Sequence, residues 1–365
     1  MAAKTLTTRE LGRATLARQM LLEREAVPAI AAVERLCGMQ AQEPRPPFAG
    51  LWSRVDGFRR DDLLEPLRSG KVVRATLMRA TLHLMSARDY RKLRSALDPM
   101  MLGAMGPRAK DVDLDAVLRE AAKLLRRGPL TFNELRAALA ERFPHADDRG
   151  LGRAVRLGMP LVMVPTDDRW AFARDSRFAP AEAVIGKPPA KRAAASELLL
   201  RYLAAFGPAT AGDFQTWSGL GGARAIVDGV REGLVELRDE RGRELFDLPD
   251  APRPGTDVPV PVRLLPDFDN LLLAHDDRTR VIADDHRGLV ATKNLRIKAT
   301  FLVDGIVSGT WAVERRGRRA TLTLAPFGRL RKADVRDLEA EGEGMLRFLE
   351  EEEASTHDVK VASAA

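Results

Sequence analysis

The chain has 365 residues, a formal net charge of +7 and a sequence pI near 9.8. This length is too great for one small core and predicts two to four domains, which the 45% hydrophobic content is enough to fold. The sequence has neither a run of about eighteen apolar residues nor a basic-then-apolar leader, so we expect a cytoplasmic, nucleoid-associated protein with no membrane partner.

The basic residues are mostly arginine, since only 11 of the 59 are lysine. Guanidinium groups suit bidentate contacts to phosphate and guanine, so this bias fits a nucleic-acid partner. A GC-rich coding genome raises arginine as well, and composition alone does not separate the two causes. The single cysteine, Cys37, excludes an internal disulfide and a cysteine-based zinc site.

The first hundred residues read as helices followed by a two-stranded ribbon. Thr7 and Glu10 form a capping box at the start of the first helical pattern. Helices are predicted over 7–23, 28–38, 47–55 and 61–69, and strands over 71–78 and 81–86. This order is typical of a winged helix.

The same order recurs twice with a different sequence. Helices are predicted over 114–126, 132–142 and 149–158, then strands over 161–165 and 169–173. A third set has helices over 194–206, 211–217 and 223–232, then strands over 234–238 and 243–248. Proline-containing linkers over 175–191 and 249–261 mark the boundaries. We therefore expect three tandem winged-helix modules, with domains at 1–105, 106–182 and 183–254.

Beyond residue 255 the pattern becomes strand-like. Strands are predicted over 262–265, 271–274, 280–283, 300–303, 306–313 and 320–324, and a charged helix over 332–350. The domain at 255–365 is expected to be small, β-rich and barrel-like, with a disordered tail after residue 350. The fold class is thus α+β, mainly α.

Gln40 and Gln42 flank Ala41 at the end of the second predicted helix, before a proline-rich segment. In an extended backbone both amides point the same way. An amide offers two donors and one acceptor and does not titrate, so the pair can orient a water or stabilise a cation without acting as a base. Two glutamines at a helix end are also common as solvated surface or as local caps.

The surrounding sequence resembles, almost residue for residue, the signature of the AlkZ-type winged-helix DNA glycosylases. The matching blocks run nearly the length of the chain, and together they are far more specific than the tripeptide alone. They are Glu34–Arg54, Met78–Leu84, Leu264–Leu272, His275–Arg280 and Val303–Trp311.

The resemblance implies a monofunctional glycosylase that excises bulky N7-alkylated guanines, unhooks interstrand crosslinks and gives self-resistance to a DNA-alkylating natural product. It implies tandem winged helices around a DNA channel, with Gln40 and Gln42 catalytic. A related, broader branch of the family carries Asp in place of the second Gln. Because this chain has Gln42, it resembles the bulky-adduct branch instead. We expect double-stranded DNA with adducts or crosslinks as partner, no cofactor and a monomer. The alternative is a non-catalytic winged-helix regulator, because winged helices are more often readers than enzymes.

Two further groups are candidate DNA contacts. Arg79, Thr81 and His83 alternate, so in a strand they share one face that could line a pocket near the glutamines. The spacing alone favours the other interpretation, a hydrogen-bonded structural histidine in a wing. Arg315, Arg316, Arg318 and Arg319 surround Gly317 at a predicted hairpin tip, which could enter a DNA groove or remain a solvated turn.

No metal site is expected. His275-Asp276-Asp277 and Asp284-Asp285-His286 contain residue types that bind metals. Their flanking arginines, Arg278, Arg280 and Arg287, instead favour ion-paired turns.

Overall fold

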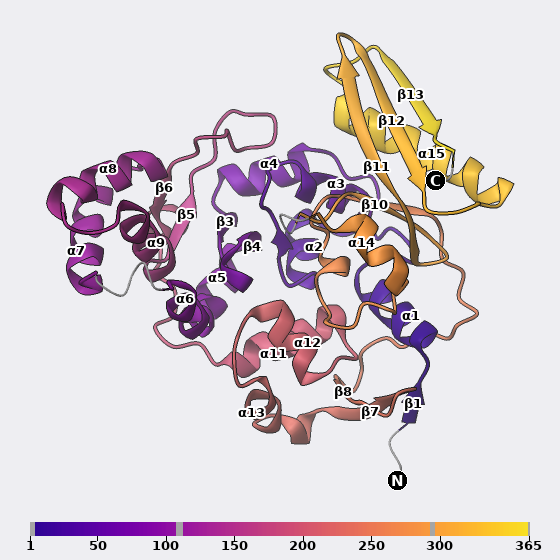
Figure 1. The fold of residues 1–365 in the computed structure, drawn as a ribbon, viewed down its shortest axis with the longest axis horizontal. Helices are drawn as coiled ribbons and strands as arrows, with labels where there is room; N and C mark the ends of the chain where they lie inside the picture. Colours follow the sequence, from indigo (N-terminus) through magenta and orange to yellow (C-terminus); the bar gives the residue numbers. More distant parts are fainter. Residues whose placement is uncertain (1–3, 107–111, 293–295, 364–365) are drawn as a thin grey trace.

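The computed structural model describes residues 4–106, 112–292 and 296–363 (Figure 1). Its N-terminal part is mainly helical; residues 29–93 lie near the centre of the molecule, and residues 4–18 lie at its lower right. Thr7 caps the first helix and forms the predicted capping box with Glu10. The helices of this part are α1 (Thr8–Arg18), α2 (Ala29–Arg35), α3 (Pro46–Trp52), α4 (Asp61–Arg68), α5 (Ala87–Leu93) and α6 (Asp98–Ala104).

A five-stranded sheet joins the first two predicted modules. Its order is β2-β4-β3-β5-β6, with every pair antiparallel. The strands are β2 (Met39–Gln40), β3 (Val72–Thr76), β4 (Leu82–Ser86), β5 (Leu161–Met163) and β6 (Phe178–Pro180). Because β5 pairs with β3, the ribbon of the second unit extends the sheet of the first. The two units share one sheet instead of forming separate ribbons.

The predicted strand over 169–173 is wrong, since that segment is a turn and β6 lies further along the chain. Side-chain oxygens hold the turn: Asp168 accepts from the backbone N–H of Trp170, and Thr166 accepts from that of Asp168. Such local bonds compete with strand pairing.

Two helical groups lie outside this centre, one at the left and one at the bottom of the view in Figure 1. The first packs Val117, Leu135, Leu139, Leu151 and Val155 into its own core. Its helices are α7 (Leu114–Leu125), α8 (Phe132–Arg142) and α9 (Asp148–Gly158), and the short α10 (Ala181–Ile185) follows β6. The second comprises α11 (Ala195–Phe206), α12 (Ala211–Ser218), α13 (Ala223–Asp228), β7 (Val235–Asp239) and β8 (Glu244–Asp247). An N-terminal strand that the sequence did not predict, β1 (Lys4–Leu6), pairs with β7 in parallel.

The C-terminal part is an open five-stranded sheet in the order β13-β12-β11-β10-β9, packed against α15 (Lys332–Glu350). Its strands are β9 (Arg263–Leu265), β10 (Thr300–Val303), β11 (Ile306–Arg316), β12 (Arg319–Pro326) and β13 (Thr356–Val361). In the described part of the chain this sheet does not close into a barrel. The tail that was expected to be disordered forms β13, which runs parallel to β12.

Two of the strands predicted in this part are wrong. Residues 271–274 overlap the 3₁₀ turn Asn270–Leu272, and 280–283 lie in turns. Asp269 caps the 3₁₀ turn by accepting from the backbone N–H of Leu271. The remaining short helices are the 3₁₀ turns Met78–Ala80, Arg94–Leu97, Arg231–Gly233 and Asp284–His286, and α14 (Arg287–Val290). The number of winged-helix modules and the domain boundaries stay predictions.

A buried ion pair connects the N-terminal helices to the loop after β9. Arg54 donates from Nη1 and Nη2 to the two carboxylate oxygens of Asp269 at 2.9 and 2.8 Å, and both side chains are at most 2% exposed. Arg54 also donates to the carbonyls of Gln19 and Gly50 at 3.1 and 2.9 Å. This pair fixes where the loop that contains Asn270 meets the rest of the chain.

Replacing Asp269 with alanine should therefore destabilise the protein strongly. The change leaves the Arg54 guanidinium buried without its counter-charge, which typically costs about 3–5 kcal/mol. Urea unfolding followed by circular dichroism measures the loss. Asp267→Ala is the matched control, because Asp267 pairs at 3.3 Å with Arg296, which is 46% exposed. Such exposed pairs contribute roughly 0–1 kcal/mol, and equal losses for the two variants would refute the role given to Asp269.

Candidate active site

The Gln-Ala-Gln segment begins at a sharp turn after α2. Cys37 and Gly38 are both left-handed, with φ of 53° and 86°, and a Cβ on Gly38 would lie 2.9 Å from the carbonyl oxygen of Leu84. Glycine is therefore required for this close approach. The turn directs Met39 and Gln40 into β2, where they pair with Leu84 and His83 of β4.

Gln40 is nearly buried and is held at both its backbone and its side chain. Its backbone N–H donates to Oδ1 of Asn270 at 3.2 Å, while Nδ2 of Asn270 donates to the carbonyl of Gly38 at 2.6 Å. Nη2 of Arg79 donates to Oε1 of Gln40 at 2.7 Å. Nε2 of Gln40 has no partner among the described residues. The amide is thus oriented by a cation and keeps its own donors available.

Gln42 lies in the bend that follows β2 and is exposed. Its Oε1 accepts from the backbone N–H of Leu82 at a long 3.4 Å. Arg74 fixes the backbone here, donating to the carbonyls of Ala41 and Gln42 at 2.9 and 3.0 Å. The two amides therefore reach the same neighbouring segment, residues 79–82, although extended backbone covers only Met39 and Gln40.

The prediction that Arg79, Thr81 and His83 share one strand face is wrong. Arg79 lies in the 3₁₀ turn Met78–Ala80, and its φ of 54° and that of Ala80, 56°, are both left-handed. Thr81 closes this turn by donating from its hydroxyl to the carbonyl of Met78 at 3.1 Å, and only His83 is in β4. Arg79 also donates to the carbonyl of Trp217. Strained backbone of this kind persists where surrounding contacts enforce it, and it is common at functional sites.

His83 is buried and neutral. Nδ1 carries the proton, since it donates to the carbonyl of Thr81 at 3.0 Å, and Nε2 has no partner in the described residues. Burial, and secondarily the positive charge of Arg79, lowers the pKa of His83 to about 3. An imidazole with this pKa is not charged near neutral pH and does not serve as a general acid there.

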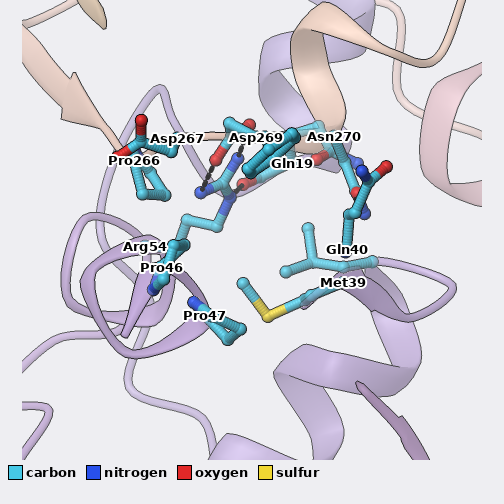
Figure 2. Close-up of a pocket in the computed structure, with 12 residues that line it drawn as sticks. Gln19, Met39, Gln40, Pro46, Pro47, Arg54, Pro266, Asp267, Asp269 and Asn270 are labelled. Atoms are coloured by element: carbon cyan, nitrogen blue, oxygen red, sulfur yellow. Dashed lines mark hydrogen bonds and ion pairs between the residues drawn. The ribbon is translucent and has the colours of Figure 1, made fainter. Parts of the chain in front are cut away.

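A small pocket lies beside Gln40 (Figure 2). About 10 Å³ is available in it to the centre of a water molecule, which is room for roughly one water and too little for a purine. Sequence reasoning did not assign Asp267, Asp269, Asn270 or Arg54 to the site, although their blocks carried the family resemblance. The lining residues are Gln19, Leu36, Met39, Gln40, Pro46, Pro47, Arg54, Pro266, Asp267, Phe268, Asp269 and Asn270.

The predicted arginine-rich tip is the turn between β11 and β12, where Arg316 and Arg319 pair across Gly317 and Arg318. Arg315 is partly neutralised by Glu350 and Glu353 at 3.5 and 3.2 Å. Arg319 lies 3.5 Å from Asp358. Arg316 is 89% exposed, and its contact at 3.6 Å is to Glu314, which is itself 74% exposed. At the tip, Arg316 and Arg318 are therefore less neutralised by neighbouring carboxylates than Arg315 and Arg319.

Other features of the described residues bear on the remaining expectations. The described residues contain no cluster of three or more His, Cys, Asp or Glu side chains that could hold a metal ion. The ring of His275 is buried, and its Nε2 lies 3.0 Å from the carbonyl oxygen of Phe206. Arg278 and Arg280, both expected in ion-paired turns, form no ion pair in this part of the chain, whereas Arg287 pairs with Asp284 at 3.3 Å. No helix here is long and apolar enough to cross a bilayer.

The low pKa of His83 predicts a specific dependence of stability on pH. The group is protonated in the unfolded chain below about pH 6.5 but stays neutral in the fold down to about 3, so its contribution is lost as pH falls through this window. Between pH 7 and pH 5 the loss should be about 2 kcal/mol. Urea unfolding of His83→Gln at both values should show a pH-dependent loss smaller by that amount. An unchanged difference would mean that His83 is protonated in the fold.

The comparisons with known proteins agree with this architecture. The sequence pattern of the AlkZ-like DNA glycosylase family matches residues 33–348. A curated relative, the interstrand DNA cross-link repair glycosylase of Streptomyces sahachiroi, is 28% identical over 357 residues, which cover 90% of this chain and 93% of the relative. The solved structure of S. sahachiroi DNA glycosylase AlkZ has the same fold, with a TM-score of 0.79 at 23% identity over 98% of this chain and 100% of that one. The family match covers far more than half of the chain, so an enzyme replaces the regulator alternative: this protein belongs to the AlkZ-like family and is a DNA glycosylase.

Proposed function

We propose that this glycosylase hydrolyses the N-glycosidic bond of bulky N7-alkylated guanines and unhooks interstrand DNA crosslinks. It would thereby give its host self-resistance to a DNA-alkylating natural product. The observation that carries the proposal is the site around Gln40, where a non-titrating amide, fixed by Asn270 and Arg79, lies beside a water-sized pocket. The name of the S. sahachiroi relative supports the crosslink substrate.

The proposed chemistry suits a base that is already cationic. Alkylation at N7 gives guanine a positive charge and makes it a good leaving group, so no acid is needed to protonate it. The enzyme has to stabilise an oxocarbenium-like sugar and direct water to it. The neutral His83 is consistent with this, because nothing in the step requires its proton.

Gln40 and Gln42 are the proposed catalytic residues. Each amide oxygen already accepts one hydrogen bond, from Arg79 and from the backbone N–H of Leu82, and a carbonyl oxygen has a second lone pair. That lone pair can accept from the attacking water and fix its direction. The unpartnered Nε2 of Gln40 can donate to the sugar or to the water. Asp269 is committed to Arg54, which leaves Asp267 as the other carboxylate at the pocket.

Excision assays test the function directly. Duplexes with one N7-methylguanine, one bulky N7-alkylguanine or one N7–N7 crosslink are incubated with the protein, treated with alkali and resolved on a denaturing gel. We expect alkali-dependent cleavage at the adducted guanine in all three, with the bulky adduct and the crosslink processed efficiently. Cleavage of the methylated duplex alone would contradict the bulky-adduct proposal.

Gln42→Asp should retain excision of N7-methylguanine and change the preference between small and bulky adducts. The substitution places a charged and stronger water activator at the position of the amide, and the exposed side chain imposes no packing cost. The ratio of single-turnover rates on the methyl and bulky duplexes measures the change. Gln42→Asn, which keeps the amide but shortens it, is the control for side-chain position. An unchanged ratio for Gln42→Asp would exclude Gln42 from adduct selection.

The hairpin tip should contribute to DNA binding through its less neutralised arginines. We expect Arg316→Ala/Arg318→Ala to weaken duplex binding and crosslink unhooking more than Arg315→Ala/Arg319→Ala does. The carboxylates beside Arg315 and Arg319 are less exposed than Glu314, the one beside Arg316, and so neutralise their arginines more. The slope of log affinity against log salt should fall by up to ~0.9 for each phosphate contact removed. If neither double variant changes binding or unhooking, the tip is a solvated turn.

A further inference from the structure

Two half-buried arginines beside the Gln-Ala-Gln segment have no carboxylate partner among the described residues. Some buried arginines elsewhere in the fold are paired with carboxylates, as in Arg18 with Asp247 at 2.7 Å and Arg54 with Asp269 at 2.8 Å. Others, such as Arg280, instead donate to a backbone carbonyl from a terminal nitrogen. Arg156 and Arg278 form no such ion pair, yet both are partly removed from water. A desolvated guanidinium without a counter-charge is costly, so its presence needs an explanation.

Arg156 lies on the Gln42 side of the segment. It extends from α9 and donates from Nε to the hydroxyl of Thr76 at 3.2 Å, while Nη1 and Nη2 have no partner in the described chain. Thr76 of β3 pairs with Leu82, whose backbone N–H meets the Gln42 amide. Arg156 is also close enough to Arg74 to help lower the pKa of that guanidinium to about 10, after the larger effect of burial.

Arg278 lies on the Gln40 side. Its Nε donates to the carbonyl of His275 at 3.3 Å, and its two terminal nitrogens are likewise without a partner in this part of the structure. The ring of His275 lies 6.4 Å from that of Tyr202, which packs at 5.1 Å on Trp217. The carbonyl of Trp217 accepts from Arg79, the residue that holds the Gln40 amide. Burial, and then the charge of Arg278, lowers the pKa of Arg79 to about 10.

The guanidinium groups of these four arginines differ in how many hydrogen-bond partners they have. Arg74 donates to two backbone carbonyls and packs on the ring of Phe172 at 4.9 Å, and Arg79 donates to Gln40 and to the carbonyl of Trp217. These two are positioning residues and raise the local positive potential. In Arg156 and Arg278 only Nε donates a hydrogen bond, so Nη1 and Nη2 are available. Two neighbouring guanidinium N–H groups can bind two oxygens of one phosphate.

We propose that Arg156 and Arg278 bind DNA backbone phosphates on the two sides of the nucleotide that faces Gln40 and Gln42. The proposal rests on the function proposed above and identifies residues of the site that bind the DNA backbone. The phosphates supply the counter-charges that the fold lacks. They also offset the field of Arg79, which by itself would oppose a positively charged sugar in the transition state.

Binding to an unmodified duplex tests this independently of excision. Fluorescence anisotropy at several salt concentrations is measured for the parent, Arg156→Gln, Arg278→Gln, and Arg336→Gln as a control that removes one exposed charge from α15. Each site variant should lower the salt slope by ~0.9 and weaken binding about eightfold near 0.1 M salt, since one phosphate's counterion release contributes ~0.9 log unit there. The control should match the parent, and Arg156→Lys should keep the slope of the parent.

Stability measurements remove the remaining ambiguity. Without DNA, the melting temperature of Arg156→Gln and Arg278→Gln should equal or exceed that of the parent at low salt, because each substitution removes an uncompensated charge. A large fall in melting temperature, or salt slopes equal to that of the control, would overturn the proposal. A parent protein that binds with these slopes but releases no base would instead refute the proposed function and leave the phosphate contacts intact.

Discussion

The buried ion pair between Arg54 and Asp269 is the constraint on which the site depends. It joins the end of α3 to the loop after β9, two segments more than 200 residues apart in sequence. The next residue in that loop, Asn270, bonds the backbone of both Gly38 and Gln40. The orientation of Gln40 is therefore set by the C-terminal part of the chain as much as by its own strand. An amide at the end of a two-residue strand is thereby held in one orientation, which its proposed catalytic role requires.

The positive charge around the amides is unusual for a site that is proposed to stabilise a cation. Arg74, Arg79, Arg156 and Arg278 concentrate positive charge there, and burial lowers the pKa of each of them. An acidic catalytic residue would balance this charge in the free protein, whereas an amide does not. The arrangement becomes favourable once DNA is bound, because the substrate itself brings the negative charge. If Arg156 and Arg278 bind phosphates as proposed, binding of the substrate also supplies the missing negative charge at the site.

Sequence reasoning predicted what local patterns determine. The helices Phe132–Arg142 and Lys332–Glu350 and the capping box at Thr7 were predicted as observed. The errors come from long-range pairing: β1 joins β7 across more than 200 residues, and β13 orders the tail by pairing with β12. The Leu-rich residues 271–274 were predicted as a strand, but Asp269 caps a 3₁₀ turn there. The prediction that Arg79, Thr81 and His83 share one strand face was wrong because Arg79 and Ala80 adopt left-handed backbone conformations. The alternation of polar residues in the sequence does not reveal such conformations.

The central claim is that the paired amides, and not a carboxylate, direct the water. Single-turnover excision of N7-methylguanine by Gln40→Ala, Gln42→Ala and Asp267→Asn tests it most directly, because Asp267 is the carboxylate at the pocket that is not committed to Arg54. We predict a rate loss of roughly a hundredfold or more for at least one glutamine variant, with duplex affinity little changed, and a rate for Asp267→Asn close to that of the parent. A large loss for Asp267→Asn with both glutamine variants near the parent rate would assign catalysis to the carboxylate and contradict the account.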